Sequence, residues 1–381
     1  MAHTSHTQGS NATPRMIGSE IYRHSHYGDW HPLRVPRVST VLDLTRSLGW
    51  LPRTQYINSP MAKPAALVGF HTADYIAALV AAERDQKVSD ATRTRHALGT
   101  HSNPVFAEMY RRPATSAGSA LLAGELLRDG GVIYAPGCGT HHAMPDRANG
   151  FCYLNDPVLA IQSLRRGGAA RVAYVDIDAH HPDGVEAAFA RDPATLLIST
   201  HEENRWPRTG GINDVGVGNM INVPMPSGCH DDDMALVRDA VILPALAAFR
   251  PDAIVLQCGA DAVTEDPQSR MALSNGALWD VVAALRGMAP RYLVMGGGGY
   301  NPWSVGRAWA GVWATLNGHD VPDDLPPAAQ DILGGLVWTD RTRHRRPQPH
   351  WITTLRDAPR LGPVDADLRA RVAVLRARLG A

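Results

Sequence analysis

The sequence predicts an α/β fold in which a parallel sheet is flanked by helices. Short apolar runs recur along the chain and are continuous rather than alternating, which is typical of strands that are buried on both faces. Segments of helical character alternate with these runs. A succession of strand, helix and strand indicates parallel strands that are joined by crossover helices.

The predicted elements follow one another from residue 115 onwards. Strands are expected at 131–137, 171–178, 195–201, 253–261 and 292–299. Helices are expected at 115–129, 155–166, 232–249, 274–287 and 303–317. In sheets of this kind, binding sites lie just beyond the carboxyl ends of the strands, so a functional site is expected there.

Composition excludes several classes of protein. The 381 residues include 37 lysines and arginines and 37 aspartates and glutamates, and this balance argues against a nucleic-acid binder. No apolar run approaches the ~20 residues of a membrane span, so no membrane partner is expected. The four cysteines form no CxxC pair, which favours free thiols in a reduced, cytoplasmic protein.

The two ends of the chain differ from its middle. Residues 1–14 lack the apolar core of a secretory signal and are expected to be disordered. Residues 15–320 are expected to form the folded domain, and residues 321–381 an extension that packs on it. An amphipathic pattern at 365–379 predicts a terminal helix. This helix would dock on the domain or contact a second subunit, and the second alternative would make the protein a homo-oligomer.

Polar residues that can do chemistry follow four of the predicted strand cores. These segments are 139–142 (GTHH), 176–184 (DIDAHHPDG), 259–261 (GAD) and 296–302 (GGGGYNP). Loops are usually polar, so one such segment carries little weight. Four of them at the same edge of a sheet predict a functional site.

Asp178, His180 and Asp261 form a candidate metal site. Side chains two residues apart at a strand end point the same way, so Asp178 and His180 can share one cation. Asp261 comes from another strand end and adds a second carboxylate. Three protein ligands leave one position open for water, which is typical of a catalytic rather than a structural metal site.

A histidine pair and two further carboxylates form a candidate proton-transfer group. His141 and His142 are adjacent, and Asp176 and Asp183 lie in the segment that carries two of the candidate ligands. A carboxylate bonded to one ring nitrogen of a histidine fixes the tautomer and raises the basicity of the other nitrogen. Two such pairs beside an activated water would transfer protons.

Four glycines at 296–299 precede Tyr300. Glycines let a backbone pass close to a ligand and adopt positive φ. A tyrosine at the end of such a loop can donate a hydrogen bond to a developing oxyanion, a contribution of roughly 3–4 kcal/mol in comparable sites.

Together these motifs resemble those of the histone deacetylase superfamily. The matching segments are GTHHAMPDRANGFCYLND (139–156), VAYVDIDAHHPDGVEAAF (172–189), QCGAD (257–261) with Asp266-Pro267, and GGGGYNPW (296–303). They occur in the family's order, cover about residues 19–320, and look most like the class I-like bacterial members called acetoin utilisation proteins. The resemblance implies a single catalytic domain with a central, mostly parallel eight-stranded sheet, related to arginase.

The resemblance also implies a zinc-dependent hydrolase that removes acetyl groups from acetyl-lysine side chains. The three candidate ligands would bind zinc, with Fe²⁺ as an alternative metal. His142 would be the general base and His141 its electrostatic and acid partner. Asp183 would pair with His142 and Asp176 with His141, while Tyr300 would stabilise the oxyanion.

Three accessory sites follow from the same resemblance. A narrow tunnel for the acyl-lysine stem would be lined by Gly150, Phe151, Trp206, Gln268 and Gly298. Arg37 would line an internal channel for acetate release. A structural potassium ion would bind, partly through backbone oxygens, at Asp176, Asp178, His180, Ser199 and Thr200.

Three positions depart from the family pattern. The family's HHGDG appears here as HHPDG at 180–184, so Pro182 stands where glycine is usual and removes an N–H. Ser102 stands near the rim aspartate that grips the peptide backbone in the eukaryotic enzymes, which puts recognition of protein substrates in doubt. Gln268 stands where leucine or methionine usually closes the tunnel wall, which suggests a more polar mouth.

Two other classes of function are disfavoured by particular residues. An arginase-like ureohydrolase needs a second metal ion, held by carboxylates two residues beyond His180 and Asp261. Pro182 and Val263 occupy those positions and cannot ligate. A metal-free binding homologue would be expected to lose a ligand, a histidine of the pair or Tyr300, and none is lost.

The substrate is left open by the sequence. An acetylated protein is the first expectation, and an acetylpolyamine or another small acylated amine is the alternative. A polyamine enzyme should present acidic residues at the tunnel mouth, for which Glu202 and Glu203 are candidates.

Overall fold

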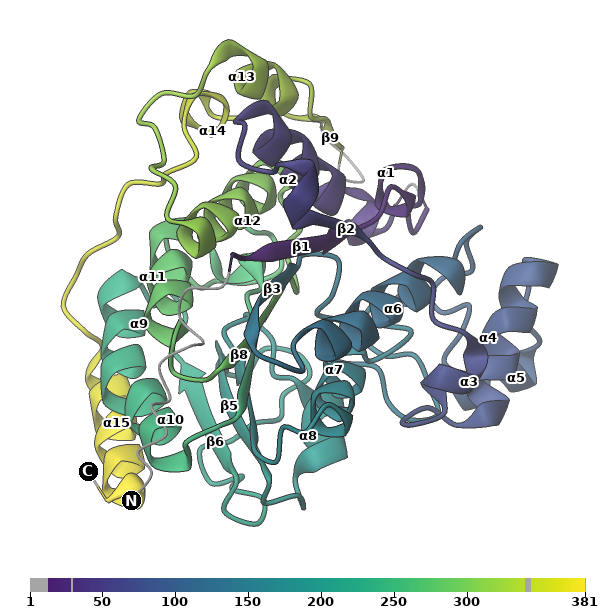
Figure 1. Cartoon of the computed structure of the whole chain (residues 1–381), viewed down its shortest axis with the longest axis horizontal. Helices are drawn as coiled ribbons and strands as arrows, with labels where there is room; N and C mark the ends of the chain where they lie inside the picture. The colour runs from purple at the N-terminus through teal and green to yellow at the C-terminus, as the bar shows by residue number, and fades with distance from the viewer. Residues whose placement is uncertain (1–12, 29, 340–343, 381) are drawn as a thin grey trace.

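The computed structural model describes residues 13–28, 30–339 and 344–380, and a single sheet lies at its centre (Figure 1). The sheet strands are β1 (Arg15–Gly18), β2 (Tyr56–Asn58), β3 (Gly131–Ala135), β4 (Val172–Asp176), β5 (Thr195–Glu202), β6 (Met220–Met225), β7 (Ala253–Gln257) and β8 (Arg291–Met295). Their order is β2-β1-β3-β8-β7-β4-β5-β6, and all neighbours are parallel. A small antiparallel pair joins β9 (Trp338–Thr339) to β10 (His344–Arg345).

Helices occupy most of the remaining chain. They are α1 (Ile21–His24), α2 (Arg37–Ser47), α3 (Pro64–Leu67), α4 (Ala73–Asp85), α5 (Asp90–His96), α6 (Arg111–Leu126), α7 (Asp156–Arg166), α8 (Asp183–Phe189), α9 (Asp231–Val237), α10 (Leu243–Phe249), α11 (Asn275–Leu285), α12 (Pro302–Asn317), α13 (Pro327–Gly334), α14 (Pro349–Thr353) and α15 (Ala366–Leu379). Short 3₁₀ segments are η1 (Pro32–Arg34), η2 (Arg53–Gln55) and η4 (Ala260–Ala262). A π-helical turn, η3 (Arg238–Ile242), joins α9 to α10.

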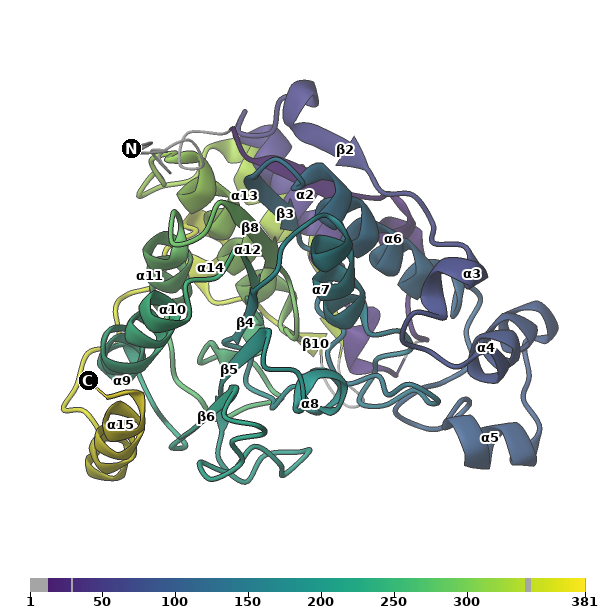
Figure 2. The same ribbon diagram turned by 60° about the horizontal axis from the view of Figure 1, so that its bottom comes forward.

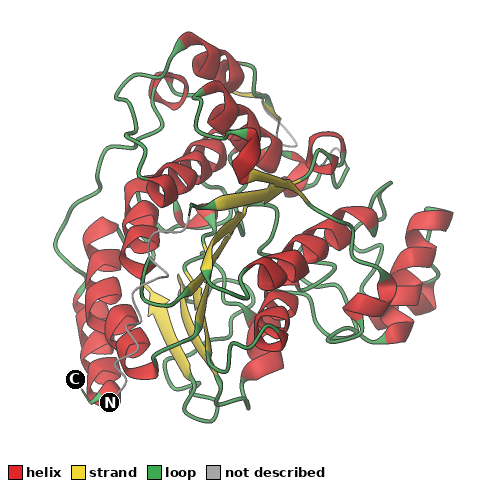
Figure 3. Cartoon of the chain, viewed as in Figure 1, coloured by secondary structure: helices red, strands yellow, loops and turns green. Residues whose placement is uncertain are grey.

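The helices cover both faces of the sheet (Figure 3). Apolar residues of α6, α7 and α8 pack with one set of strand side chains, which includes Ile133 and Val255. Apolar residues of α2, α11 and α12 pack with the alternate set, which includes Tyr134 and Leu256. Every residue of β3, β4 and β7 is buried. The predicted α/β fold with a doubly covered, parallel sheet is therefore confirmed.

The predicted strands are present, but several end earlier than the apolar runs suggested. The run 171–178 forms a strand only as far as Asp176, and the run 253–261 only as far as Gln257. Past the end of β4 the backbone turns, and side chains take part in its hydrogen bonds. The N–H of Asp178, for example, donates to Oδ1 of Asp176 over 3.0 Å. The candidate ligands therefore lie in turns just past the sheet rather than in strands.

The C-terminal segment returns to the body of the molecule. Its last helix, α15, lies beside α9 and α10 (Figure 2). Leu368, Val372 and Leu375 of this helix are buried and belong to the main apolar core. The domain limits given above stay predictions, and the predicted disordered segment lies outside the described residues except for positions 13 and 14.

Two expectations about the environment of the chain can be compared with the fold. The four cysteines are free, as the sequence predicted, and all four are buried. Among the described residues, every helix is too short or too polar to span a lipid bilayer.

Candidate metal centre and active site

Four neighbouring strands bring the candidate residues to one edge of the sheet. β3, β8, β7 and β4 lie side by side in that order, so the loops at their carboxyl ends meet. His141 and His142 follow β3, Tyr300 follows β8, Asp261 follows β7, and Asp176 ends β4. The strand order therefore gathers at one edge the residues that the sequence placed at strand ends.

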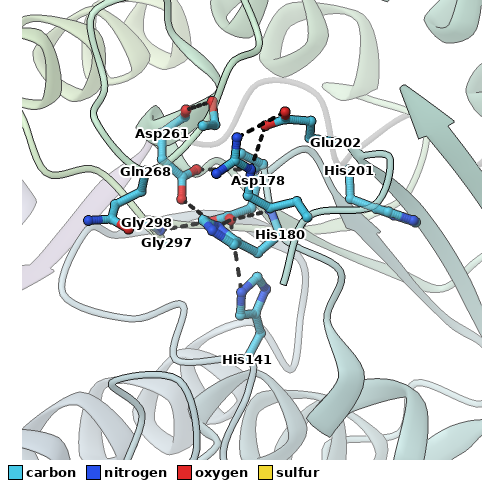
Figure 4. Close-up of polar contacts among 12 residues, drawn as sticks. His141, Asp178, His180, His201, Glu202, Asp261, Gln268, Gly297 and Gly298 are labelled. Atoms are coloured by element: carbon cyan, nitrogen blue, oxygen red, sulfur yellow. Dashed lines mark hydrogen bonds and ion pairs between the residues drawn. The ribbon is translucent and has the colours of Figure 1, made fainter. Parts of the chain in front are cut away.

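Asp178, His180 and Asp261 converge on one point, and Figure 4 shows their side chains facing one another. Nδ1 of His180 lies 2.9 Å from Oδ2 of Asp261 and 3.2 Å from Oδ1 of Asp178. One ligand atom from each residue falls within 4.8 Å of the other two, and all three side chains are buried. Within the described part of the chain, no other set of three or more such residues converges in this way.

Two glycines make room for the carboxylates. A Cβ on Gly259 would lie 2.1 Å from Oδ2 of Asp178, and a Cβ on Gly298 would lie 2.0 Å from Oδ2 of Asp261. The backbone N–H of Gly298 also donates a 2.6 Å hydrogen bond to Oδ2 of Asp178. Because only hydrogen atoms fit at both positions, the backbone forms a close cradle around the carboxylates.

The donor set fits a divalent cation with one position free. Two carboxylate oxygens and one imidazole nitrogen are ligands that zinc accepts in catalytic sites. Burial lowers the pKa of His180, but its hydrogen bonds with Asp178 and Asp261 and their charges outweigh burial and raise it to about 10. The carboxylates therefore attract positive charge to this point, and a divalent cation supplies such a charge.

His141 and His142 each pair with a carboxylate. Nδ1 of His141 lies 2.8 Å from Oδ2 of Asp176, and Nδ1 of His142 lies 2.7 Å from Oδ1 of Asp183. The two Nε2 atoms face each other at 2.9 Å, and Nε2 of His141 is 3.9 Å from Oδ1 of Asp178. Both pairings are those expected from the sequence, and they bring the two Nε2 atoms beside the candidate metal ligands.

The two imidazoles differ in charge. Burial lowers the pKa of His141, but the charges of Asp176 and Asp178 outweigh burial and raise it to about 9. Burial and the charge of His141 lower the pKa of His142 to about 3, and they outweigh the hydrogen bond with Asp183, which raises it. Near neutral pH, His141 is therefore the cation, and His142 keeps the neutral form that can accept a proton.

Tyr300 lies between the glycine run and α12. Its backbone N–H donates to Oδ2 of Asp266 over 2.6 Å, and the next residue, Asn301, caps α12 by accepting from the N–H of Trp303. Burial, together with the charge of Asp261, raises the pKa of the Tyr300 phenol well above its usual value. The hydroxyl therefore keeps its proton and can act as a hydrogen-bond donor.

A cavity of about 360 Å³ leads to this group of residues. Its lining is made up of Ala97, Thr100, Ser102, Asn103, His142, Ala148, Asn149, Gly150, Phe151, His180, Trp206, Gln268 and Tyr300. Four of the five predicted tunnel residues belong to this lining. The fifth, Gly298, lies behind the carboxylates, where its missing side chain makes room for them.

Aromatic rings form part of the cavity wall. The ring of Trp206 meets that of His142 edge-on with centroids 4.6 Å apart, and Phe151 meets Tyr300 edge-on at 5.9 Å. A Cβ on Gly150 would lie 2.2 Å from Cη2 of Trp206, so glycine lets the indole pack over this backbone. An apolar wall of this kind suits a methylene chain, which needs no polar partners.

A family model described as "Histone deacetylase domain" matches residues 31–316. The chain belongs to the histone deacetylase family. The Bacillus subtilis acetoin utilization protein AcuC is 32% identical over 325 residues, which cover 82% of this chain and 84% of the relative. Histone deacetylase 8 of Xenopus tropicalis is 32% identical over 303 residues, covering 77% of this chain and 81% of the relative.

Solved structures agree with the family assignment. The crystal structure of a histone deacetylase homologue from Aquifex aeolicus has a TM-score of 0.91 and 32% sequence identity, and the match covers 96% of this chain and 100% of that one. The chain spans only 61% of the length of a Caenorhabditis elegans relative, "Putative histone deacetylase 2". Family membership makes this chain a deacetylase, a hydrolase of a metal-dependent family, with a buried Asp-His-Asp site.

In this deacetylase Arg37 lies beside the glycine run. Its buried guanidinium donates a 2.6 Å hydrogen bond to the carbonyl oxygen of Gly297 and lies over the ring of Trp309, 5.3 Å from the centroid. Its role in an acetate channel stays a prediction.

The residues of the predicted potassium site lie together at the ends of β4 and β5. Asp176 and Ser199 are register partners, and the hydroxyl of Thr200 donates to the carbonyl oxygen of Asp176 over 3.4 Å. The N–H of His180 donates to Oδ1 of Asp178 over 2.9 Å, which closes the turn that follows β4. Whether potassium binds here stays a prediction.

The departures from the deacetylase motifs are accommodated locally. Pro182 immediately precedes α8, where the N–H that proline lacks is not required. Asp183 therefore still reaches His142. Gln268 and Ser102 both line the cavity. The cavity therefore carries neutral polar groups, in line with the more polar mouth that Gln268 suggested.

Sequence reasoning missed residues that hold the catalytic groups of the deacetylase in place. Nδ2 of Asn149 donates to Oδ2 of Asp183 over 2.9 Å, and Oδ1 of Asn103 accepts from the N–H of Phe151 over 3.0 Å. Asn149 lies inside the matching segment 139–156, so its position was visible although its role was not. Asn103 lies in a loop with no pattern that could have revealed it.

Proposed function

We propose that this deacetylase is a zinc enzyme that hydrolyses the amide of acetyl-lysine side chains in proteins. The observation that carries the proposal is the convergence of Asp178, His180 and Asp261 beside a cavity that His142 and Tyr300 also line. A set of metal ligands, a neutral base and a phenol donor are the parts that amide hydrolysis by an activated water requires.

The proposed chemistry follows from the position of each group. Asp178, His180 and Asp261 would hold the zinc ion, which would supply a Lewis acid for the acyl oxygen and lower the pKa of water at the site. His142 accepts the proton of the attacking water at Nε2, because its Nδ1 is paired with Asp183. Tyr300 donates its hydroxyl proton in a hydrogen bond to the acyl oxygen as that oxygen becomes negative.

The same groups complete the reaction. The C–N bond breaks as the histidine pair delivers a proton to the departing amine, and acetate and the free lysine amine are the products. His141, whose Nδ1 is paired with Asp176, is placed to stabilise the negative charge that develops beside it. Arg37 provides a buried positive charge next to the glycine run, which supports its proposed role in releasing acetate.

The lack of carboxylates in the described cavity lining, which includes neither Glu202 nor Glu203, favours a lysine within a peptide over a polyamine. Oε2 and Oε1 of Glu202 accept from Arg205 over 2.6 and 2.9 Å, and Oε2 of Glu203 accepts from Arg371 over 2.7 Å. The two acidic candidates are therefore neutralised by arginines. Among the described residues that line the cavity, none carries a carboxylate to bind a distal ammonium group.

The test is a comparison of kcat/KM on the zinc-loaded enzyme with an acetyl-lysine peptide and an N-acetylated polyamine. We expect a preference for the peptide of more than about tenfold, which corresponds to about 1.4 kcal/mol. The reverse preference would identify a small-amine deacetylase. Loss of activity on both, with zinc bound, would contradict the proposed acyl group or amine.

Gln268→Glu provides a matched variant for this comparison. The substitution keeps the shape of the side chain and adds one negative charge to the cavity wall. If the neutral mouth disfavours a polyamine, this variant should raise kcat/KM for the polyamine relative to the peptide. An unchanged ratio would mean that Gln268 does not face the distal part of the substrate.

Three finer points belong to the same proposal. Zinc rather than Fe²⁺ is proposed as the working metal, which activity after reconstitution with each ion under anaerobic conditions would test. Potassium is proposed at the turn that follows β4. The free, buried cysteines support a cytoplasmic location.

A further inference from the structure

The C-terminal segment of the chain contacts loops that form the mouth of the cavity, although it lies outside the matched family domain at 31–316. Figure 1 shows it in yellow, running along one side of the molecule and ending in α15 beside α9 and α10. One contact reaches the loop that carries Gln268, where Nη2 of Arg360 lies 3.4 Å from Oε1 of Glu265. The others reach the loop that carries Trp206.

Three consecutive aspartates fix the path of this segment. Residues 231–233 begin α9, and each of their carboxylates accepts one backbone N–H from the segment. The donors are Arg360 to Asp231 over 2.9 Å, Gly362 to Asp232 over 2.8 Å, and Asp365 to Asp233 over 3.0 Å. Asp365 then caps α15 by accepting from the N–H of Leu368. The start of α15 is therefore held at a defined place.

Two arginines of α15 reach the loop between β5 and β6. They are seven residues apart, which places them on the same side of the helix two turns from each other. Arg371 donates to Oε2 of Glu203 over 2.7 Å and to a carbonyl oxygen of β6 over 2.5 Å. Arg378 donates to the carbonyl oxygen of Ile212 over 2.5 Å and to Oδ1 of Asn213 over 2.7 Å. The helix therefore binds both ends of the segment 203–213.

The middle of this loop is the part that faces the cavity. Trp206 lines the cavity, meets the ring of His142, and is 43% exposed. On the inner side the loop is held by Thr209, whose hydroxyl lies 2.8 Å from Nδ1 of His181. The arginines of α15 hold it on the outer side. A shift of the loop would move the indole along the wall against which the acyl-lysine stem lies.

We propose that Arg371 and Arg378 are positioning residues for substrate binding, which act by holding the Trp206 loop in place. The inference rests on the proposed function, because the indole matters only if a substrate occupies this cavity. The arginines touch no reacting atom, so they should affect binding of the stem more than the chemical step.

The first test replaces each arginine by methionine, which keeps the aliphatic stem that covers the apolar surface. We expect Arg371→Met and Arg378→Met each to raise KM for the acetyl-lysine peptide about threefold, and the double variant about tenfold, with kcat nearly unchanged. Arg376→Met is the matched control, because Arg376 lies on the same helix and is exposed. Glu203→Gln should raise KM as Arg371→Met does. Arg371→Lys keeps the positive charge, so it should raise KM less than Arg371→Met.

The second test measures the loop without turnover. Hydrogen–deuterium exchange of the full-length protein should be faster at residues 204–213 in the two positioning variants and unchanged in Arg376→Met. Equal exchange in all variants would overturn the proposal, as would faster exchange with an unchanged KM. A parallel fall of kcat and thermal stability would also overturn it, because the arginines would then act on the whole fold.

The two tests separate this inference from the proposed function. If the wild-type enzyme hydrolysed neither the peptide nor the polyamine, the proposed function would fail. Exchange at 204–213 would still decide whether α15 holds the loop.

Discussion

At the scale of single residues, the proposed chemistry depends on the different states of two adjacent imidazoles. His141 and His142 share a short contact between their Nε2 atoms, yet their carboxylate partners come from different elements. Asp176 ends β4, whereas Asp183 begins α8. The environment therefore makes one ring a cation and keeps the other neutral, so their roles should not be interchangeable.

The substitution His142→Ala tests the role of the base. It should lower kcat by about 10² to 10⁴. Among the described residues that line the cavity, no other neutral imidazole could replace His142 as the base. Zinc content and the circular dichroism spectrum should match those of the wild type. The exposed His24 provides a control, since His24→Ala should keep full activity. More than a tenth of wild-type activity in His142→Ala would contradict the assigned role.

The cradle around the carboxylates makes a separate prediction for Gly298. The new Cβ in Gly298→Ala would lie 2.0 Å from Oδ2 of Asp261, so the ligand must move. We expect zinc affinity to fall about 10- to 100-fold, as for other changes to groups that orient metal ligands. Competition with a chromogenic chelator measures this affinity. Gly334→Ala, where the added Cβ meets nothing within 4 Å, should leave the affinity unchanged.

At the scale of elements, burial decided what could be predicted. The runs that became β3, β4, β5, β7 and β8 are buried and apolar, and the sequence revealed all of them. β1 and β2 have only four and three residues, too few for a recognisable pattern. β6 contains Pro224, which argues against a strand, but β6 lies at the edge of the sheet, where proline is tolerated.

The same reasoning applies to the site. Asp178, His180 and Asp261 were recognisable because they follow strands within compact motifs. Asn103 was not recognisable, because its role depends on a hydrogen bond with Phe151, which is distant in the sequence and comes close only in the fold. Gly298 belonged to a recognisable motif, yet its position behind the carboxylates rather than on the cavity wall required the structure.

A buried histidine links two elements and makes stability depend on pH. His71 lies between α3 and α4, and its Nε2 accepts from the N–H of Asn155, the cap of α7, over 2.9 Å. Burial lowers the pKa of His71 to about 4. The unfolded chain, with a pKa near 6.5, therefore binds a proton more readily, and stability falls as pH decreases from about 6.5 towards 4.

The variant His71→Gln isolates this contribution, because its amide oxygen can still accept from Asn155. Urea unfolding at pH 7 and pH 5 should show that the wild type loses about 2 kcal/mol more than the variant over this interval. His24→Gln, at an exposed position, should behave as the wild type. Parallel losses in the wild type and His71→Gln would show that His71 does not titrate in this way.

At the scale of the whole molecule, the metal should stabilise the fold as well as enable catalysis. Two buried carboxylates and one imidazole join the ends of β4 and β7, and a cation between them reduces the repulsion of the carboxylates. Removal of zinc by a chelator should lower the unfolding free energy by about 4 kcal/mol if zinc had been present at about 1,000 times its dissociation constant. Readdition should restore both stability and activity.

Asp261→Asn provides the matched control for the metal. It removes one ligand charge with little change in shape, so its unfolding midpoint should respond only weakly to zinc or to a chelator. An equal response in the wild type and in Asp261→Asn would place the stabilising metal at another site.

The strand order also bears on how the chain folds. β3, β8, β7 and β4 are neighbours in the sheet, but the chain visits them far apart and in another order. Contacts of such long sequence separation form slowly, because a large loop must close before they stabilise anything. All three candidate ligands follow β4 or β7, which are direct neighbours in the sheet. A refolding chain can therefore capture zinc tightly only when β7 has joined β4, and recovery of metal binding would mark the pairing of these two strands.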